Sequence, residues 1–174
     1  MKNNIILVGM MGAGKTYIGK ALKQAKPEMN LIDVDEYIEK HQCTKISEIF
    51  SIYGEKYFRE IETKSITEII QKENQIISLG GGAFENKANR EILNKNGYTI
   101  YLKATADIIF DRIKHETHRP LLQQGFGVEK IEEILAIREK NYEQALITVD
   151  TCRKSQYNII GEIMKRIDEY AKQN

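Results

Sequence analysis

The chain has 174 residues, a charged fraction of 29% and a formal net charge of +1. A chain of this length folds as one domain with a sizeable core, and its balanced charge argues against a nucleic-acid-binding protein, which would carry a basic stripe. Cys43 and Cys152 form neither a zinc-binding spacing nor a disulfide framework, so we expect a reducing, cytoplasmic location. The apolar run that ends at Val8 is too short for a signal peptide or a membrane helix, so we expect no association with a membrane.

Short apolar segments alternate with helical patterns along the whole chain. The first segment, 5–8, holds four apolar residues rich in β-branched types, which is typical of a buried parallel strand. The other expected strands are 30–35, 75–79, 98–102 and 147–150. The expected helices are 17–23, 36–41, 46–53, a long run after Gly54 to about 72, 87–96, 106–114, 129–144 and 157–171. This alternation predicts a single α/β domain over 1–174, with helices flanking a five-stranded parallel sheet.

The residues from Gly9 to Thr16 read GMMGAGKT and fit the phosphate-binding P-loop pattern. The motif lies between an expected strand and an expected helix, and this context makes a chance glycine-rich turn improbable. Its glycines let the backbone N–H groups surround a polyphosphate at a helix N-terminus, where the helix dipole favours an anion. Lys15 would reach the β- and γ-phosphates and the Thr16 hydroxyl would hold Mg²⁺. We expect Lys15 to add nothing to the core.

Two carboxylates follow the second expected strand. Ligands bind beyond the carboxyl ends of such strands, so Asp33 and Asp35 can both reach the cleft. Phosphoryl transfer needs a carboxylate near Mg²⁺ and a group that orients or deprotonates the acceptor hydroxyl, and one aspartate could serve each purpose. Spacing alone leaves a second interpretation of Asp35 open, namely that it caps the helix that follows.

Four further features could carry chemistry, and each has a simpler interpretation. Arg59 and Glu62 share one helix face, where a surface ion pair is the simpler alternative. The triplet 80–82 follows a strand and permits close approach of the backbone to a ligand, or forms a flexible turn. Arg119 lies in a polar segment that could act as a lid, where its charge would stabilise the γ-phosphoryl during transfer, or it is an exposed loop charge. Arg138 lies among glutamates, where a solvated helix face is the default.

In their order along the chain, these motifs resemble those of the shikimate kinase family. The P-loop alone is shared by many kinases, whereas the ordered set is far more specific, above all the glycine triplet together with Arg-Pro-Leu-Leu. The matching motifs are Gly9–Thr16, Asp33-x-Asp35, Phe58-Arg59-x-x-Glu62, Gly80-Gly81-Gly82, Arg119-Pro120-Leu121-Leu122 and Arg138-x-x-x-Tyr142.

The resemblance implies a small P-loop kinase of the nucleoside-monophosphate-kinase type. Its fold would be a three-layer sandwich around a five-stranded parallel sheet, with a substrate-binding subdomain at about 33–62 and a mobile lid at about 112–127. Its reaction would transfer the γ-phosphoryl of ATP to the 3-hydroxyl of shikimate, giving 3-phosphoshikimate and ADP on the route to chorismate and the aromatic amino acids. ATP and Mg²⁺ would be the cofactors and shikimate the small-molecule substrate. We expect a monomer.

The resemblance also implies roles for single residues. Lys15, Asp35 and Arg119 would be catalytic, with Asp35 holding the shikimate hydroxyls and serving as the base. Arg59 and Arg138 would clamp the shikimate carboxylate, and Glu62 would orient Arg59. The substrate would also receive backbone N–H groups from Gly80, Gly81 and Gly82. The nucleotide would contact Gly12, Ala13, Gly14, Lys15, Thr16, Tyr17, Arg112, Arg119 and Arg153, and Mg²⁺ would be held by Thr16 and Asp33.

The chain departs from the family pattern at a few positions. Thr16 stands where the family often has serine, and both residues supply the required hydroxyl. The lid residues 122–128 are specific to this chain, so the sequence does not predict how the lid closes. Two other interpretations remain. One is a different small-metabolite P-loop kinase, such as a gluconate kinase, and the other is a nucleotide-binding module without turnover.

Overall fold

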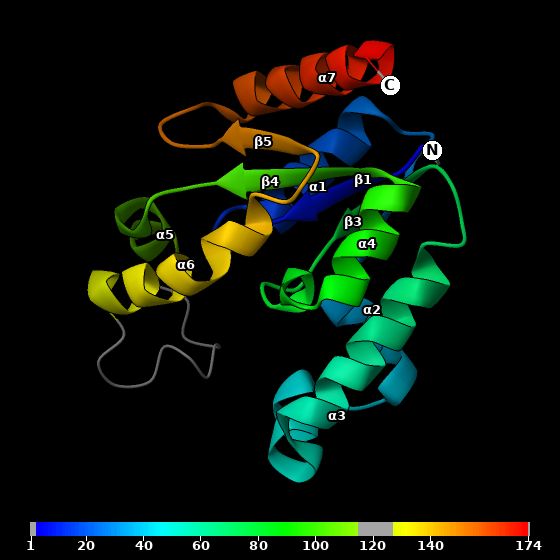
Figure 1. The fold of residues 1–174 in the computed structure, drawn as a ribbon, viewed down its shortest axis with the longest axis vertical. Helices are drawn as coiled ribbons and strands as arrows, with labels where there is room; N and C mark the ends of the chain where they lie inside the picture. The colour runs from blue at the N-terminus through cyan, green and yellow to red at the C-terminus, as the bar shows by residue number, and fades with distance from the viewer. Residues whose placement is uncertain (1–2, 115–126, 174) are drawn as a thin grey trace.

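The computed structural model describes residues 3–114 and 127–173, and five parallel strands form its central sheet. The strands lie in the order β2-β3-β1-β4-β5, as Figure 1 shows. Every neighbouring pair is parallel, which confirms the predicted architecture. The strand bounds are β1 Ile5–Val8, β2 Asn30–Asp33, β3 Gln75–Ser78, β4 Tyr98–Lys103 and β5 Ile147–Asp150.

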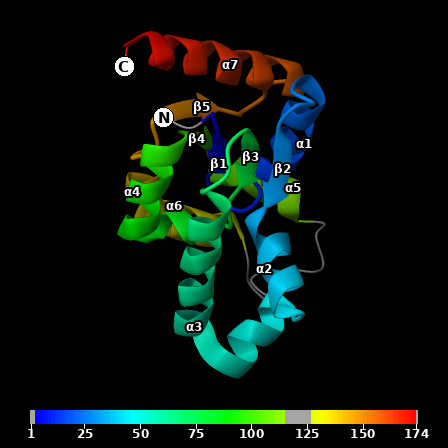
Figure 2. The same ribbon diagram turned by 90° about the vertical axis from the view of Figure 1, so that its right-hand side faces the viewer.

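Helices cover both faces of the sheet, so the fold is the expected three-layer sandwich (Figures 1 and 2). The bounds are α1 Lys15–Ala25, α2 Val34–Gln42, α3 Ile46–Ile69, η1 Ala83–Glu85, α4 Lys87–Asn96, α5 Ala106–Ile113, α6 Val128–Tyr142 and α7 Gln156–Gln173. Alternate residues of β1 point to opposite faces: Ile5 and Leu7 pack in one core with α1 and α7, and Ile6 and Val8 pack in the other. The second core includes residues from α2 to α6. Burial on both faces explains why the strand is continuously apolar.

Helices α2 and α3 extend away from the sheet, and α3 bends near its N-terminal end (Figure 2). The bend lies at Gly54, whose φ of 80° and ψ of 171° are not helical. The sequence predicted two helices separated by this glycine, and the structure joins them across the kink. No helix within 3–114 or 127–173 combines the length and apolar character that a membrane crossing requires.

The strand expected over 30–35 is wrong at its end, because β2 stops at Asp33 and Val34 begins α2. The cause is local: the Asp33 carboxylate accepts hydrogen bonds from the N–H groups of Asp35 and Glu36, at 3.1 and 3.4 Å. These bonds satisfy N–H groups that the first turn of a helix leaves unpaired. Asp33 is therefore the helix cap, and the capping interpretation of Asp35 is wrong.

Candidate active site

A cavity of about 780 Å³ opens at the carboxyl ends of the strands. Its size lies within the range typical of small-molecule sites, and its place is where ligands bind in open parallel sheets. The lining combines the N-terminus of α1, both aspartates, the glycine segment after β3 and the loop after β5. The lining residues are 11–18, Asp33, Asp35, 78–81, Arg112, Thr151, 154–156 and Ile159.

The P-loop joins β1 to α1, as its sequence context predicted. Gly14 is the N-cap residue of α1 and has a φ of 96°, a left-handed conformation that favours glycine. The helix begins directly at Lys15, so its N-terminal N–H groups and the positive end of its dipole border the cavity. Gly12, Ala13, Thr16 and Tyr17 line the same cavity, an arrangement suited to a polyphosphate.

Lys15 is only 9% exposed. Its Nζ donates to the carbonyl oxygens of Gly9 at 2.8 Å and Met10 at 3.0 Å. Lys15 belongs to neither hydrophobic core, as expected, but its ammonium group closes the P-loop on itself. The side chain lies inside the phosphate-binding loop and stabilises its curvature.

Asp33 and Thr16 lie together beside the P-loop. The Thr16 hydroxyl donates to Asp33 Oδ2 at 3.1 Å, while Asp33 Oδ1 caps α2. Mg²⁺ prefers oxygen ligands and is usually held by one or two carboxylates together with substrate phosphates and water. A hydroxyl and a carboxylate at the edge of a phosphate loop fit this ion. Within the described parts of the chain, no group of three or more His, Cys, Asp or Glu residues could hold a metal by itself.

Asp35 and Glu62 converge on the first glycine of the triplet. A Cβ atom added to Gly80 would lie 2.7 Å from Asp35 Oδ1 and 3.2 Å from Glu62 Oε1. Any larger residue would displace these carboxylates, which gives a physical reason for glycine at this position. Asp35 lies in the first turn of α2 and lines the cavity, whereas Glu62 lies on α3 and is not among the lining residues.

Arg59 forms an ion pair with a buried acid. Its Nη1 lies 2.8 Å from Glu62 Oε2, and its Nη2 lies 3.2 Å from Glu55 Oε1. Glu62 is 1% exposed, so the surface-pair interpretation fails on that side. Burial raises the pKa of Glu62, and Arg59 only partly opposes this shift. Burial also lowers the pKa of Arg59, but the neighbouring Glu62 and Glu55 outweigh that effect, and its pKa is raised.

The glycine triplet lies between Arg59 and α6. A Cβ atom added to Gly82 would lie 2.6 Å from Arg59 Nη2. From α6, Arg138 Nη1 donates to the Gly81 carbonyl oxygen at 3.4 Å, and the Tyr142 hydroxyl donates to the same oxygen. Arg138 is half-buried and faces the triplet, so its default placement on a solvated helix face is wrong.

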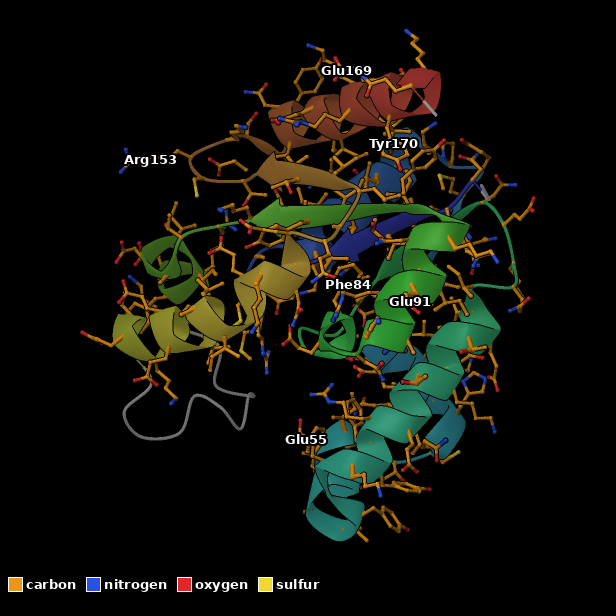
Figure 3. All side chains as sticks on the ribbon, in the orientation of Figure 1. Glu55, Phe84, Glu91, Arg153, Glu169 and Tyr170 are labelled. Atoms are coloured by element: carbon orange, nitrogen blue, oxygen red, sulfur yellow. The ribbon has the colours of Figure 1, made fainter. Side chains whose placement is uncertain are left out.

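Three predicted arginines remain, and the structure places only two of them. Arg112 lines the cavity, and its guanidinium donates to the carbonyl oxygens of Ala13 at 3.1 Å and Thr151 at 3.2 Å. Arg153 is exposed and is not among the cavity-lining residues, and Figure 3 shows its side chain projecting outward from the loop between β5 and α7. Arg119 lies outside the described residues, as does most of the expected lid.

Sequence reasoning missed two residues that the structure brings to the site. Tyr142 ends the motif Arg138-x-x-x-Tyr142, for which the sequence predicts no role at this residue, and it is fully buried against the glycine triplet. Its position one helical turn after Arg138 was the available signal, because residues four apart share a helix face. Thr151, which is 1% exposed and bonded to Arg112, carried no signal in the sequence.

Comparison with known proteins relates most of the chain to a single family. A family model described as shikimate kinase matches residues 11–168. The chain belongs to the shikimate kinase family. A shikimate kinase from Mannheimia succiniciproducens is 42% identical over 171 residues, which cover 97% of each chain. A shikimate kinase from Thermodesulfovibrio yellowstonii is 41% identical over 165 residues, which cover 95% of each.

Solved structures of shikimate kinases share this fold. The shikimate kinase from Acinetobacter baumannii in complex with shikimate has a TM-score of 0.89 and 32% identity, covering 97% of this chain and 94% of that one. The enzyme from Bacteroides thetaiotaomicron has a TM-score of 0.88 and 32% identity, covering 97% and 99%. A gluconokinase from Sinorhizobium meliloti, with 12% identity and a TM-score of 0.56, shares the fold alone. Membership of the shikimate kinase family confirms the resemblance found in the motifs.

Proposed function

We propose that this protein transfers the γ-phosphoryl group of ATP to the 3-hydroxyl of shikimate, giving 3-phosphoshikimate and ADP. The observation that carries the proposal is that Arg59 and Arg138 both lie beside one glycine triplet, close enough for both to act on the buried Glu62. Shikimate has one carboxylate, and guanidinium groups bind carboxylates through paired hydrogen bonds. Asp35 lies beside the same triplet and lines the nucleotide cavity, so an acceptor hydroxyl held there would face the P-loop.

On the nucleotide side, the P-loop N–H groups and Lys15 would bind the β- and γ-phosphates. Thr16 and Asp33 would hold Mg²⁺, which when bound would neutralise charge on the phosphate oxygens. The Thr16–Asp33 hydrogen bond supports this assignment because it places two hard oxygen ligands together. Arg112 holds two backbone carbonyls beside the loop and would border the adenine, and Tyr17 and Arg153 would contribute from the exposed rim.

On the acceptor side, Asp35 would orient the 3-hydroxyl and accept its proton during transfer. A general base contributes about 10²–10⁴-fold to the rate of such a step. Arg59, positioned by Glu62, and Arg138 would fix the carboxylate, and backbone N–H groups of the triplet would complete the binding of the ring. Positioning of this kind supplies much of the catalysis in phosphoryl transfer, since the protein performs little covalent chemistry.

Three further proposals follow from the family. Residues 33–62 would act as a substrate-binding subdomain, consistent with the projection of α2 and α3 from the sheet (Figure 2). The segment 112–127 would act as a lid, bringing Arg119 to the phosphates. The protein would work as a cytoplasmic monomer, with neither nucleic acid nor membrane as partner.

A coupled assay of ADP release tests the proposed function. Purified protein is given ATP and Mg²⁺ with shikimate, with gluconate or with no acceptor. We expect ADP release that depends on shikimate and no release above background with gluconate. Release with gluconate alone would favour the other kinase, and nucleotide binding without turnover would favour the non-catalytic module.

A further inference from the structure

The carbonyl groups of the glycine triplet accept hydrogen bonds from different partners, and only that of Gly81 is bound by side chains from a distant helix among the described residues. The Gly80 carbonyl oxygen accepts from the Ala83 N–H and the Gly82 carbonyl oxygen accepts from the Glu85 N–H, both at 3.1 Å. These two bonds belong to the local turn that forms η1. The Gly81 carbonyl oxygen instead accepts from Tyr142 and Arg138, which lie about sixty positions later on α6. The orientation of this one peptide group is therefore set by tertiary contacts.

The orientation of the Gly81 carbonyl fixes the direction of the next N–H group. The described residues contain no cis peptide bond, and in a trans peptide the carbonyl and the following N–H point in opposite directions. With its carbonyl held toward α6, the Gly81–Gly82 peptide directs the Gly82 N–H away from that helix. Among the described residues this N–H has no acceptor. It is a backbone donor beside the guanidinium of Arg59, which lies 2.6 Å from the position of a Gly82 Cβ.

The Tyr142 hydroxyl is suited to hold this peptide group, because it stays protonated over the ordinary pH range. The side chain is 0% exposed and its ring packs against that of Tyr101, with 5.3 Å between the ring centroids. Burial raises the pKa of Tyr142 to about 12, so the phenol stays protonated and remains a donor. Arg138 reaches the same carbonyl at 3.4 Å from the same helix face, and it would turn toward a bound anion.

We propose that Tyr142 is a positioning residue for the acceptor substrate, which holds the Gly81–Gly82 peptide so that the Gly82 N–H donates to the substrate carboxylate beside Arg59. This inference rests on the proposed function, since it names a group that prepares the same carboxylate site. Tyr142 itself touches only protein. A fixed donor binds an anion better than a free one because no ordering remains to be done when the ligand arrives.

The test is Tyr142→Phe, with Tyr101→Phe as the matched control. Both variants keep the paired aromatic rings, but only the first removes a hydroxyl from the glycine triplet, because the Tyr101 hydroxyl donates to Glu139 at 3.5 Å. Loss of one hydrogen bond predicts a rise in KM for shikimate of about 3–10-fold in Tyr142→Phe. KM for ATP should be unchanged in both variants, and KM for shikimate should be unchanged in Tyr101→Phe.

A comparison of substrates separates positioning from general loosening. With shikimate methyl ester, which lacks the anion, the KM ratio of Tyr142→Phe to the wild type should fall toward one. An unchanged KM for shikimate in Tyr142→Phe, an equal rise in Tyr101→Phe, or the same ratio for acid and ester would overturn the inference. Failure of the wild type to phosphorylate shikimate would instead overturn the proposed function.

Because Tyr142 is fully buried, a second pair of substitutions protects the test against misfolding. Tyr142→4-fluorophenylalanine fills the volume of the hydroxyl without a donor, and Tyr142→4-aminophenylalanine restores a donor at the same place. We expect the fluoro variant to show the raised KM and the amino variant to return KM to within about twofold of the wild type. Equal KM values for the two variants would overturn the inference.

Discussion

Removal of the negative charge from shikimate tests the carboxylate clamp directly. The methyl ester keeps every ring hydroxyl and removes only the anion that Arg59 and Arg138 are proposed to bind. The assay measures kcat/KM for the acid and the ester with the wild type and with Arg59→Lys and Arg138→Lys. Because a lysine ammonium is a point charge, it cannot reproduce the paired hydrogen bonds of a guanidinium, so both variants should use the acid poorly.

The contacts of the two arginines set the size of the effect. Loss of one partner from a buried charged pair costs about 2–5 kcal/mol. Arg59 keeps Glu62 at 2.8 Å and Glu55 at 3.2 Å when the anion is absent, and its side chain is 30% exposed. Arg138 keeps the Gly81 carbonyl at 3.4 Å, and it lies close enough to the buried Glu62 to lower the pKa of that acid. The lower part of the range therefore applies, and the wild type should lose about 30–150-fold in kcat/KM with the ester.

The lysine variants provide the sharper comparison, because discrimination between acid and ester should shrink in both. Arg166→Lys is the matched control: Arg166 also pairs with a glutamate, Glu162 at 2.9 Å, but it lies on α7 in the other helical layer. This control should keep the activity and the discrimination of the wild type. The reasoning would be refuted if the wild type used the ester as well as the acid, or if Arg59→Lys and Arg138→Lys discriminated as the wild type does.

Three further predictions address the P-loop and the carboxylates. Lys15→Met should abolish turnover and leave the circular dichroism spectrum unchanged. Urea unfolding should show that the free energy of unfolding falls by about 1–3 kcal/mol, because two loop carbonyls lose a buried donor. Normal turnover would contradict the P-loop assignment. Asp35→Asn should lower kcat by about 10²-fold or more, and calorimetry should show unchanged ATP binding. Asp33→Asn, which keeps the helix cap, is the control for folding. An equal loss of ATP and shikimate binding in Asp35→Asn would contradict the role of Asp35. Burial raises the pKa of Glu62 above its ordinary 4.5, so its contribution to stability is complete below that pH and is lost as the pH rises through the folded-state pKa. Urea unfolding should therefore show Glu62→Gln gaining stability relative to the wild type as the pH rises above 4.5, whereas a gain as the pH falls would reverse the sign of the argument. Glu55→Gln, at the exposed partner of the same arginine, serves as the control.

The sequence by itself determined the elements and the phosphate loop. The strand Ile5–Val8, the glycines after it and the apolar spacing after Lys15 are local patterns, and local patterns suffice because strand and helix periods are short. The parallel class of the sheet follows from the alternation of strands and helices. The family motifs added the identity of the acceptor, which no periodic pattern contains.

The end of β2 shows that the sequence alone could not decide which of two neighbouring aspartates caps the helix. Asp33 and Asp35 are both suited to cap a helix, and spacing did not distinguish them. The observed bonds from Asp33 to the N–H groups of Asp35 and Glu36 decide the matter, and they leave Asp35 directed at Gly80. Asp33 also accepts a hydrogen bond from the hydroxyl of Thr16, which lies seventeen positions earlier in the chain.

Only the tertiary structure decided which charged residues are buried and which of them meet. The spacing of Arg59 and Glu62 is the same for a surface pair and for a buried one, and only the packing of α3 against α2, α4 and η1 leaves Glu62 1% exposed. Likewise, the sequence placed Arg138 on a helix, but the contact of α6 with the glycine triplet brings it, with Tyr142, to Gly81. Burial and convergence depend on residues far apart in the chain, so no local pattern carries them, and the substrate side of the site is made almost entirely of such contacts.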